Sequence, residues 1–134
     1  MQSHDNKEQS LLEQAYGTAF AELTFPEQRL ITLSLATSTD DISDNQLYWV
    51  SREDMVREGG ISPHAKFKDL EAIAEALFTR AIDVKPAPGI IHHIWWLSDL
   101  KRDVSHNRVG LRYSFSLAKF FNRNRYTSMT QTIV

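Results

Sequence analysis

The fold is decided by residues 51–82, which read SREDMVREGGISPHAKFKDLEAIAEALFTRAI. Ser51 followed by Asp54 resembles a helix capping box, with Asp in place of the usual Glu or Gln. This pattern predicts a short helix from Arg52 to Glu58. The Gly59–Gly60 pair ends that helix, because glycine readily adopts the left-handed conformation found at helix C-termini. The stretch therefore begins with a short helix and a tight turn.

A second helix is predicted after the glycine turn. Ser62 is a favourable N-cap residue, and Pro63 suits the first helical position, where its missing N–H is not needed. Apolar residues then recur at steps of three and four, which places them on one helix face: Phe67, Leu70, Ala74, Leu77 and Ala81. This is the layout of a helix-turn-helix, whose second helix can enter the major groove of DNA. An ordinary helical hairpin without a DNA role has the same pattern.

The flanking segments predict further helices and a small sheet. Apolar spacing predicts a helix from Leu11, and the Thr24–Glu27 capping box predicts the start of another. Short β-branched and aromatic runs predict strands at residues 47–50, 82–84, 90–100 and 109–115. The last two strands form a hairpin around the turn at residues 105–107, and Ser116 is expected to cap a short helix through Phe121.

A helix-turn-helix followed by a β-hairpin indicates a winged helix of the α+β class, with the hairpin as the wing. The length of the chain fits one domain. We expect residues 1–10 to be disordered, residues 11–125 to form the winged-helix domain, and residues 126–134 to be a flexible tail.

The composition limits the classes of protein to consider. The 134-residue chain has a formal net charge of −2 and no cysteine, which excludes disulfides and suits a cytoplasmic protein. The sequence lacks a run of about 18 apolar residues, so it predicts no membrane span. The charge is uneven: residues 1–60 carry 4 basic and 11 acidic side chains, whereas residues 101–134 carry 7 and 1. The two ends are therefore expected to act on different partners.

Two groups of residues are the candidates for contact with double-stranded DNA. The first lies at the front of the second helix, where phosphate and base contacts require basic and small polar side chains: Ser62, His64, Lys66 and Lys68. The second flanks the turn of the wing, and a charged wing tip often contacts phosphate: Lys101, Arg102 and Arg108. The alternatives are a solvated helix face and a solvated turn. Arg80, at the far end of the second helix, is expected to be structural and paired with an acidic neighbour.

The apolar strand at residues 90–100 is the candidate for self-association. Adjacent residues of a strand point to opposite faces, so one of Trp95 and Trp96 is expected in the core and the other on the surface. The predicted homodimer interface is the face that carries Ile91, His93, Trp95 and Leu97. The alternative role for the exposed ring is stacking on a base, although single-strand binding usually uses several such rings.

The sequence offers no catalytic or metal-binding pattern. The adjacent His92 and His93 point to opposite faces and cannot easily share a metal ion, and no H-x-x-x-H spacing is present. No G-x-S-x-G, P-loop or G-x-G-x-x-G motif occurs. We therefore expect a protein that is not an enzyme and that needs no metal or cofactor.

Three blocks of sequence resemble the N-terminal winged-helix domain of iteron-binding plasmid replication initiators, the Rep proteins. The first, residues 23–31, reads LTFPEQRLI and is similar to the family's LTxxEqRLI opening. The second combines residues 60–62 with FKDL at residues 67–70 and LFTRAI at residues 77–82, and is similar to the family's helix pattern. The third is Trp96 in a strand, followed by an alternating strand and a short helix.

The resemblance implies a protein that binds plasmid origin repeats as a monomer, recruits host replication proteins and represses its own gene as a dimer. It implies that this domain mediates dimerisation and adds DNA contacts at one end of the site. Family members usually continue into a second winged helix that makes most of the specific contacts, whereas this sequence ends at Val134. We therefore expect half an initiator, with weak DNA affinity. The alternatives are a winged-helix transcriptional regulator and a dimerisation-only module without DNA binding.

Overall fold

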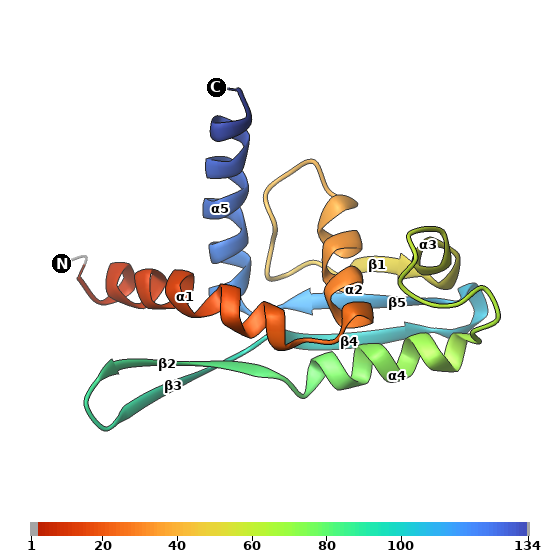
Figure 1. Cartoon of the computed structure of the whole chain (residues 1–134), viewed down its shortest axis with the longest axis horizontal. Coiled ribbons are helices and arrows are strands. Elements are labelled where there is room, and N and C mark those ends of the chain that lie inside the picture. The colour runs from red at the N-terminus through yellow and green to blue at the C-terminus, as the bar shows by residue number, and fades with distance from the viewer. Residues whose placement is uncertain (1–2, 134) are drawn as a thin grey trace.

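A computed structural model describes the backbone of residues 3–133 and the side chains of residues 9–124. The elements follow in the order α1 (Ser3–Glu22), α2 (Phe25–Ala36), β1 (Tyr48–Ser51), α3 (Arg52–Arg57), α4 (Phe67–Phe78), β2 (Ala81–Ala87), β3 (Ile90–Trp95), β4 (Leu97–Asp103), η1 (Val104–His106), β5 (Arg108–Tyr113) and α5 (Phe115–Ile133). Strands β1, β5 and β4 form one antiparallel sheet in that order, and β2 and β3 form a separate two-stranded sheet. Figure 1 shows that the two sheets extend in opposite directions from the end of α4.

The three-stranded sheet and helices α2, α3 and α4 form the winged helix, and the β4–β5 hairpin is the wing. This confirms the predicted α+β winged-helix fold. The β2–β3 hairpin, residues 81–95, is an addition between α4 and the wing, and we call it the arm. Helix α1 packs against β2 of the arm, and α5 leaves the end of β5 (Figure 1).

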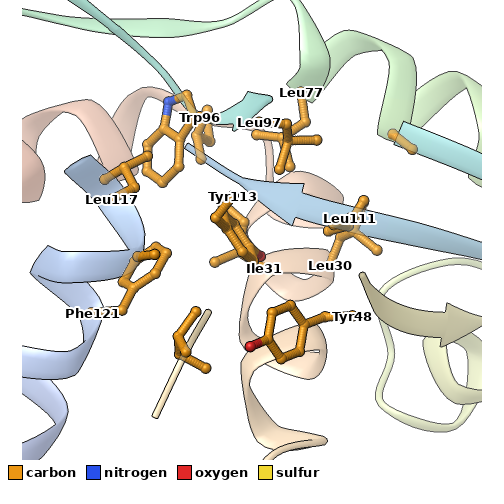
Figure 2. Close-up of a cluster of buried hydrophobic side chains, with 14 of the residues drawn as sticks. Leu30, Ile31, Tyr48, Leu77, Trp96, Leu97, Leu111, Tyr113, Leu117 and Phe121 are labelled. Atoms are coloured by element: carbon orange, nitrogen blue, oxygen red, sulfur yellow. The ribbon is translucent and has the colours of Figure 1, made fainter. Parts of the chain in front are cut away.

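The core lies between the helices and the three-stranded sheet. Figure 2 shows side chains from α2, β1, α4, β5 and α5 converging there. The labelled members include Leu30, Ile31, Tyr48, Leu77, Trp96, Leu97, Leu111, Tyr113, Leu117 and Phe121. The predicted apolar face of α4 is confirmed for Leu70, Ala74 and Leu77, which are fully buried, whereas Ala81 lies in β2 and not in the helix. This face fixes α4 against the sheet and leaves its other side exposed.

The two predicted capping boxes are present. The backbone N–H of Glu27 donates to Thr24 Oγ1, and the N–H of Thr24 donates back to Glu27 Oε1 at 2.8 Å. Ser51 and Asp54 make the same reciprocal pair of bonds at the start of α3. Gly59 ends α3 with a φ of 75°, a conformation that favours glycine. Local sequence signals therefore set three of these helix ends.

The predicted start of α4 at Ser62 and Pro63 is wrong. Residues 61–66 form a loop, and the helix begins at Phe67. The Asp69 carboxylate accepts a hydrogen bond from the backbone N–H of Lys66 at 2.7 Å, so Asp69 stabilises this later start. The Ser62 hydroxyl instead accepts the N–H of His64, which closes a local turn.

The single strand predicted at residues 90–100 is two strands. Trp96 interrupts it, because its N–H donates to the carbonyl of Arg80 and its carbonyl accepts the N–H of Ser114, both at 3.2 Å. These bonds turn the chain from the arm into the wing. The predicted cap of the last helix is also displaced, since Ser114 rather than Ser116 accepts the N–H of Leu117.

The described backbone is helical near both ends of the chain, and the expected disorder of residues 1–10 and flexibility of residues 126–134 stay predictions. Helix α1 begins at Ser3, and α5 continues to Ile133, while residues 1, 2 and 134 lie outside the described residues. Gln9 and Leu12 are buried where α1 lies on the rest of the chain. Tertiary packing of these α1 side chains therefore stabilises the helix, and the polar sequence of residues 1–10 does not reveal such packing.

Candidate nucleic-acid interface

Three parts of the winged helix meet at one end of the molecule. Figure 1 shows the α3–α4 loop, the first turn of α4 and the turn of the wing together, with the arm pointing the opposite way. The N–H of Arg52 donates to the carbonyl of Asn107 at 2.8 Å, which ties the start of α3 to the wing turn. The elements at this end carry the predicted DNA-binding residues, and we call this end of the domain the basic end: Ser62, His64, Lys66, Lys68, Lys101, Arg102 and Arg108.

The α3–α4 loop is held by Arg52. Its Nε donates to the carbonyl of Ala65, and its Nη2 donates to the carbonyl of Pro63, both at 2.7 Å. These bonds satisfy loop carbonyls and fix the backbone that carries the exposed His64 and Lys66. The sequence does not reveal this role of Arg52, because its hydrogen-bond partners, Pro63 and Ala65, lie eleven and thirteen positions further along the chain.

Lys66 and Lys68 remain available for an anion. Both side chains are exposed, and neither forms an ion pair with another described side chain. They flank the N-terminus of α4, where the helix dipole and the first backbone N–H groups favour negative charge. A phosphate that approaches this turn therefore meets two cations and the positive end of a helix, beside the Asp69 carboxylate that caps it.

The wing joins α4 through Arg102. Its Nη1 lies 3.0 Å from Glu75 Oε1 and 3.5 Å from Glu71 Oε2. The charge of Arg102 is therefore largely balanced by these two glutamates. Together they make the side of α4 that faces Arg102 acidic. Lys101, by contrast, is exposed and forms no ion pair with a described side chain.

Arg108 fixes the turn of the wing. Its Nε donates to Asp103 Oδ2 at 2.9 Å, and its guanidinium lies 4.2 Å from the centre of the Trp49 ring. Hydrogen bonds from Arg108, and then from His106, hold the pKa of Asp103 well below its usual value. A Cβ at Gly110 would come within 3.0 Å of the Trp49 ring, so glycine lets the ring lie close to β5. Arg108 thus shapes the wing that presents the neighbouring cations.

The arm carries most of the predicted dimer face. Ile91 is 62% exposed and Trp95 is 48% exposed. His93 lies between them on the same face, 2.5 Å from Asp83 Oδ1 through its Nδ1, with its ring edge-on to Trp95. The prediction that Leu97 belongs to this face is wrong, because Leu97 lies beyond the break at Trp96 and is buried in the core.

The prediction that one tryptophan is buried is confirmed. Trp96 is 1% exposed and its ring centre lies 5.4 Å from that of Tyr16. The neighbouring Trp95 is the exposed one. Trp95 is the last residue of β3 and stays on the surface, whereas Trp96 is buried at the bend between the arm and the wing.

The structural role predicted for Arg80 is also confirmed. Its Nε lies 2.8 Å from Glu27 Oε2, and the Glu27 side chain is only 1% exposed. Burial alone would raise the pKa of Glu27, but hydrogen bonds from Arg80 and Thr24 outweigh it and lower that pKa. Because the carbonyl of Arg80 also accepts the N–H of Trp96, this residue joins α2, α4 and the arm.

Within residues 3–133, no helix is long and apolar enough to cross a membrane. In the same part of the chain, no three His, Asp or Glu side chains cluster closely enough to hold a metal ion.

Residues 7–133 match the protein family described as Initiator Replication protein, WH1. The chain belongs to this family. The match covers all the elements of the winged helix and the arm, and it confirms the resemblance drawn from the sequence blocks. No curated protein matches this initiator domain.

Solved structures show the same fold. One is the WH1 domain of MSBI1.176, a replication protein isolated from a multiple sclerosis patient, with a TM-score of 0.73 and 18% identity over 85% of this chain and 92% of that one. Another is the Pi initiator protein in complex with iteron DNA, with a TM-score of 0.60 and 13% identity over 75% of this chain. The initiator domain described here spans 44% of the Pi chain.

Proposed function

We propose that this WH1 domain binds double-stranded DNA through the basic end. The observation that carries the proposal is the placement of Lys66 and Lys68 at the N-terminus of α4, at the end of the domain where the wing turns. Lys101 adds an exposed cation on the face of β4 opposite to Arg102. The loop that carries Lys66 is held by hydrogen bonds from Arg52, and Lys68 lies in the first turn of α4. The similarity in fold to an initiator that was solved with iteron DNA supports the same ligand class.

The affinity is expected to be low. Few cations face outward, and Glu71 and Glu75 place negative charge beside them. Binding should fall in the non-specific range, about 10⁻⁴ to 10⁻⁶ M at physiological salt. Phosphate contacts position a protein on DNA but carry little sequence information, so sequence preference should also be weak.

Membership of the initiator family supports a role for this domain in plasmid replication. In this proposal the domain takes part in initiation of plasmid replication in the cytoplasm, at origin repeats and together with host replication proteins. As a dimer it represses its own gene. Recognition of specific bases is assigned to other parts of an initiator, since the basic end offers mainly phosphate contacts.

Replacing both Lys66 and Lys68 with alanine should weaken DNA binding to a similar degree on iteron-like and scrambled duplexes, because both lysines contact phosphate. Fluorescence anisotropy at a fixed salt concentration measures the effect. The matched control replaces Lys85 on the arm and Lys119 on α5, which removes the same charge elsewhere. Equal weakening by the two double variants would show that net charge, and not the basic end, governs binding.

We also propose that the domain forms a homodimer through the arm. The supporting observation is that Ile90, Ile91 and Trp95 are each about half exposed or more, on a hairpin that projects from the domain. Exposed apolar surface of this kind marks interaction sites and is an aggregation hazard if left uncovered.

Sedimentation should detect the dimer at tens of micromolar, on the order typical for weak pairs. Ile91→Asp should shift the chain to monomer, because it places a charge on the apolar face of the arm. Val104→Asp is the control, since Val104 is 65% exposed at the wing turn, far from the arm. A wild-type chain that remains monomeric under these conditions would refute dimerisation.

Two alternatives predict different results. A winged-helix transcriptional regulator would prefer its own operator sequence, whereas the proposed domain shows little preference by itself. A dimerisation-only module would sediment as a dimer and show no salt-dependent DNA binding.

A further inference from the structure

The turn of the wing holds a histidine in a fixed orientation. His106 is the last residue of η1, and its Nδ1 lies 2.9 Å from Asp103 Oδ2. The Ser105 hydroxyl donates to Asp103 Oδ1 at 2.9 Å and lies 3.2 Å from the same ring nitrogen. These bonds fix one edge of the ring against the turn, while the His106 side chain as a whole is 70% exposed.

The ionisation of Asp103 decides which ring nitrogen of His106 carries the hydrogen. Hydrogen bonds from Arg108, and then from His106, hold the pKa of Asp103 well below its usual value, so at neutral pH the carboxylate can only accept hydrogen bonds. Nδ1 is therefore the donor, and Nε2 of the neutral ring carries only a lone pair. The charges of Asp103 and Arg108 cancel in their ion pair, so protonation of the ring gives the turn a positive charge.

Helix α3 begins beside this turn. The backbone N–H of Arg52 donates to the carbonyl of Asn107 at 2.8 Å, while the Arg52 guanidinium binds carbonyls of the α3–α4 loop. Asp54 pairs with Arg57, and Glu53 is exposed and forms no ion pair with a described side chain. Within the described residues, none of these α3 side chains bonds to the histidine ring, so its Nε2 stays available to a ligand.

The wing turn also lies at the basic end, together with the first turn of α4 (Figure 1). The phosphates of a duplex bound there can reach His106 as well as Lys66 and Lys68. A protonated ring would donate a charge-assisted hydrogen bond from Nε2 to a phosphate, whereas the lone pair of a neutral ring would repel the phosphate oxygens. The contact therefore depends on the protonation of the ring.

We propose that His106 is a proton-dependent contact between the wing and a DNA phosphate. The inference rests on the proposed DNA binding through the basic end, and it adds a contact residue and a dependence on pH. Histidine is the side chain that ordinarily changes charge between about pH 5 and 8, so the contact forms as the pH falls through this range. Asp103 is the positioning residue, because it holds Nδ1 and leaves Nε2 for the phosphate.

Salt titrations of duplex DNA binding, at about pH 6 and about pH 8, test this inference. The slope of log K against log salt should be steeper for wild type at the lower pH, and His106→Gln should remove about one unit of that difference. At the higher pH His106→Gln should bind as wild type does, because the neutral ring makes no phosphate contact and the amide can still donate to Asp103. His106→Lys should keep the steeper slope at both pH values.

The arm provides the matched control. His93 is also bonded to a carboxylate through Nδ1, 2.5 Å from Asp83 Oδ1, and its side chain is 50% exposed, but it lies away from the basic end. His93→Gln should therefore keep the wild-type dependence on pH.

The two proposals fail in different ways. If His106→Gln keeps the full difference between the two pH values, or weakens binding equally at both, the inference is overturned. The proposed function still stands in that case if the Lys66→Ala, Lys68→Ala double variant weakens binding. A wild-type chain without salt-dependent DNA binding at either pH would overturn both.

Discussion

Replacing Trp96 with alanine should lower the free energy of unfolding by about 3–5 kcal/mol, the usual cost of removing a large aromatic side chain from a core. Trp96 is 1% exposed and contacts Tyr16, and its backbone joins the arm to β5 at the point where the two sheets separate. The cavity would lie between α1, α5 and the sheet, where rigid elements cannot easily close it. Urea unfolding followed by circular dichroism measures the change.

The adjacent Trp95 provides the matched control for this prediction. Trp95→Ala removes the same atoms from a ring that is 48% exposed, so it should cost much less stability. It should instead weaken the dimer in sedimentation experiments. Equal destabilisation by the two substitutions would contradict the assignment of one ring to the core and the other to the surface.

Replacing Arg80 with alanine should also destabilise the chain strongly, because it leaves the buried Glu27 carboxylate without its charged partner. Breaking a buried pair in this way costs roughly 3–5 kcal/mol, and we expect the lower end because the Arg80 side chain is 40% exposed. The double variant Glu27→Gln with Arg80→Ala should be more stable than Arg80→Ala alone, since it removes the uncompensated charge. Urea unfolding measures both variants. A double variant that is no more stable than Arg80→Ala would show that Arg80 acts through packing only.

The same pair predicts a dependence of stability on pH. The pKa of Glu27 lies below its ordinary value of 4.5 in the folded chain, so the pair stabilises the fold above that value. This contribution is lost as the pH falls through the lower, folded-state pKa. Wild type should therefore lose more stability than Glu27→Gln between pH 5 and the acid limit of folding, in unfolding experiments at a series of pH values.

Local signals in the sequence were sufficient for much of the fold. The capping boxes at Thr24 and Ser51, the φ-permissive Gly59 and the apolar face of α4 each depend on residues within one or two turns. Each was predicted correctly for that reason. The pairing of Arg80 with an acidic residue was also predicted, although its partner, Glu27, is 53 residues away.

The errors arose where distant residues decide the structure. The break at Trp96 depends on hydrogen bonds to Arg80 and Ser114, so the alternating pattern of residues 90–100 could not reveal it. Its consequence is that Leu97 is in the core, while Ile91 and Trp95 stay exposed on the arm. The glutamate partners of Arg102 were invisible in the same way, because the nearer one, Glu75, is 27 residues away. The DNA contacts of Arg102 and Arg108 stay predictions.

The central claim is that the cations at the start of α4 contact DNA phosphates. The most direct test is the dependence of the DNA dissociation constant on salt concentration for wild type and for the Lys66→Ala, Lys68→Ala double variant. Each phosphate contact contributes about one unit to the slope of log K against log salt, so the double variant should have a slope flatter by about two units. An unchanged slope would contradict the claim and favour a domain that only dimerises.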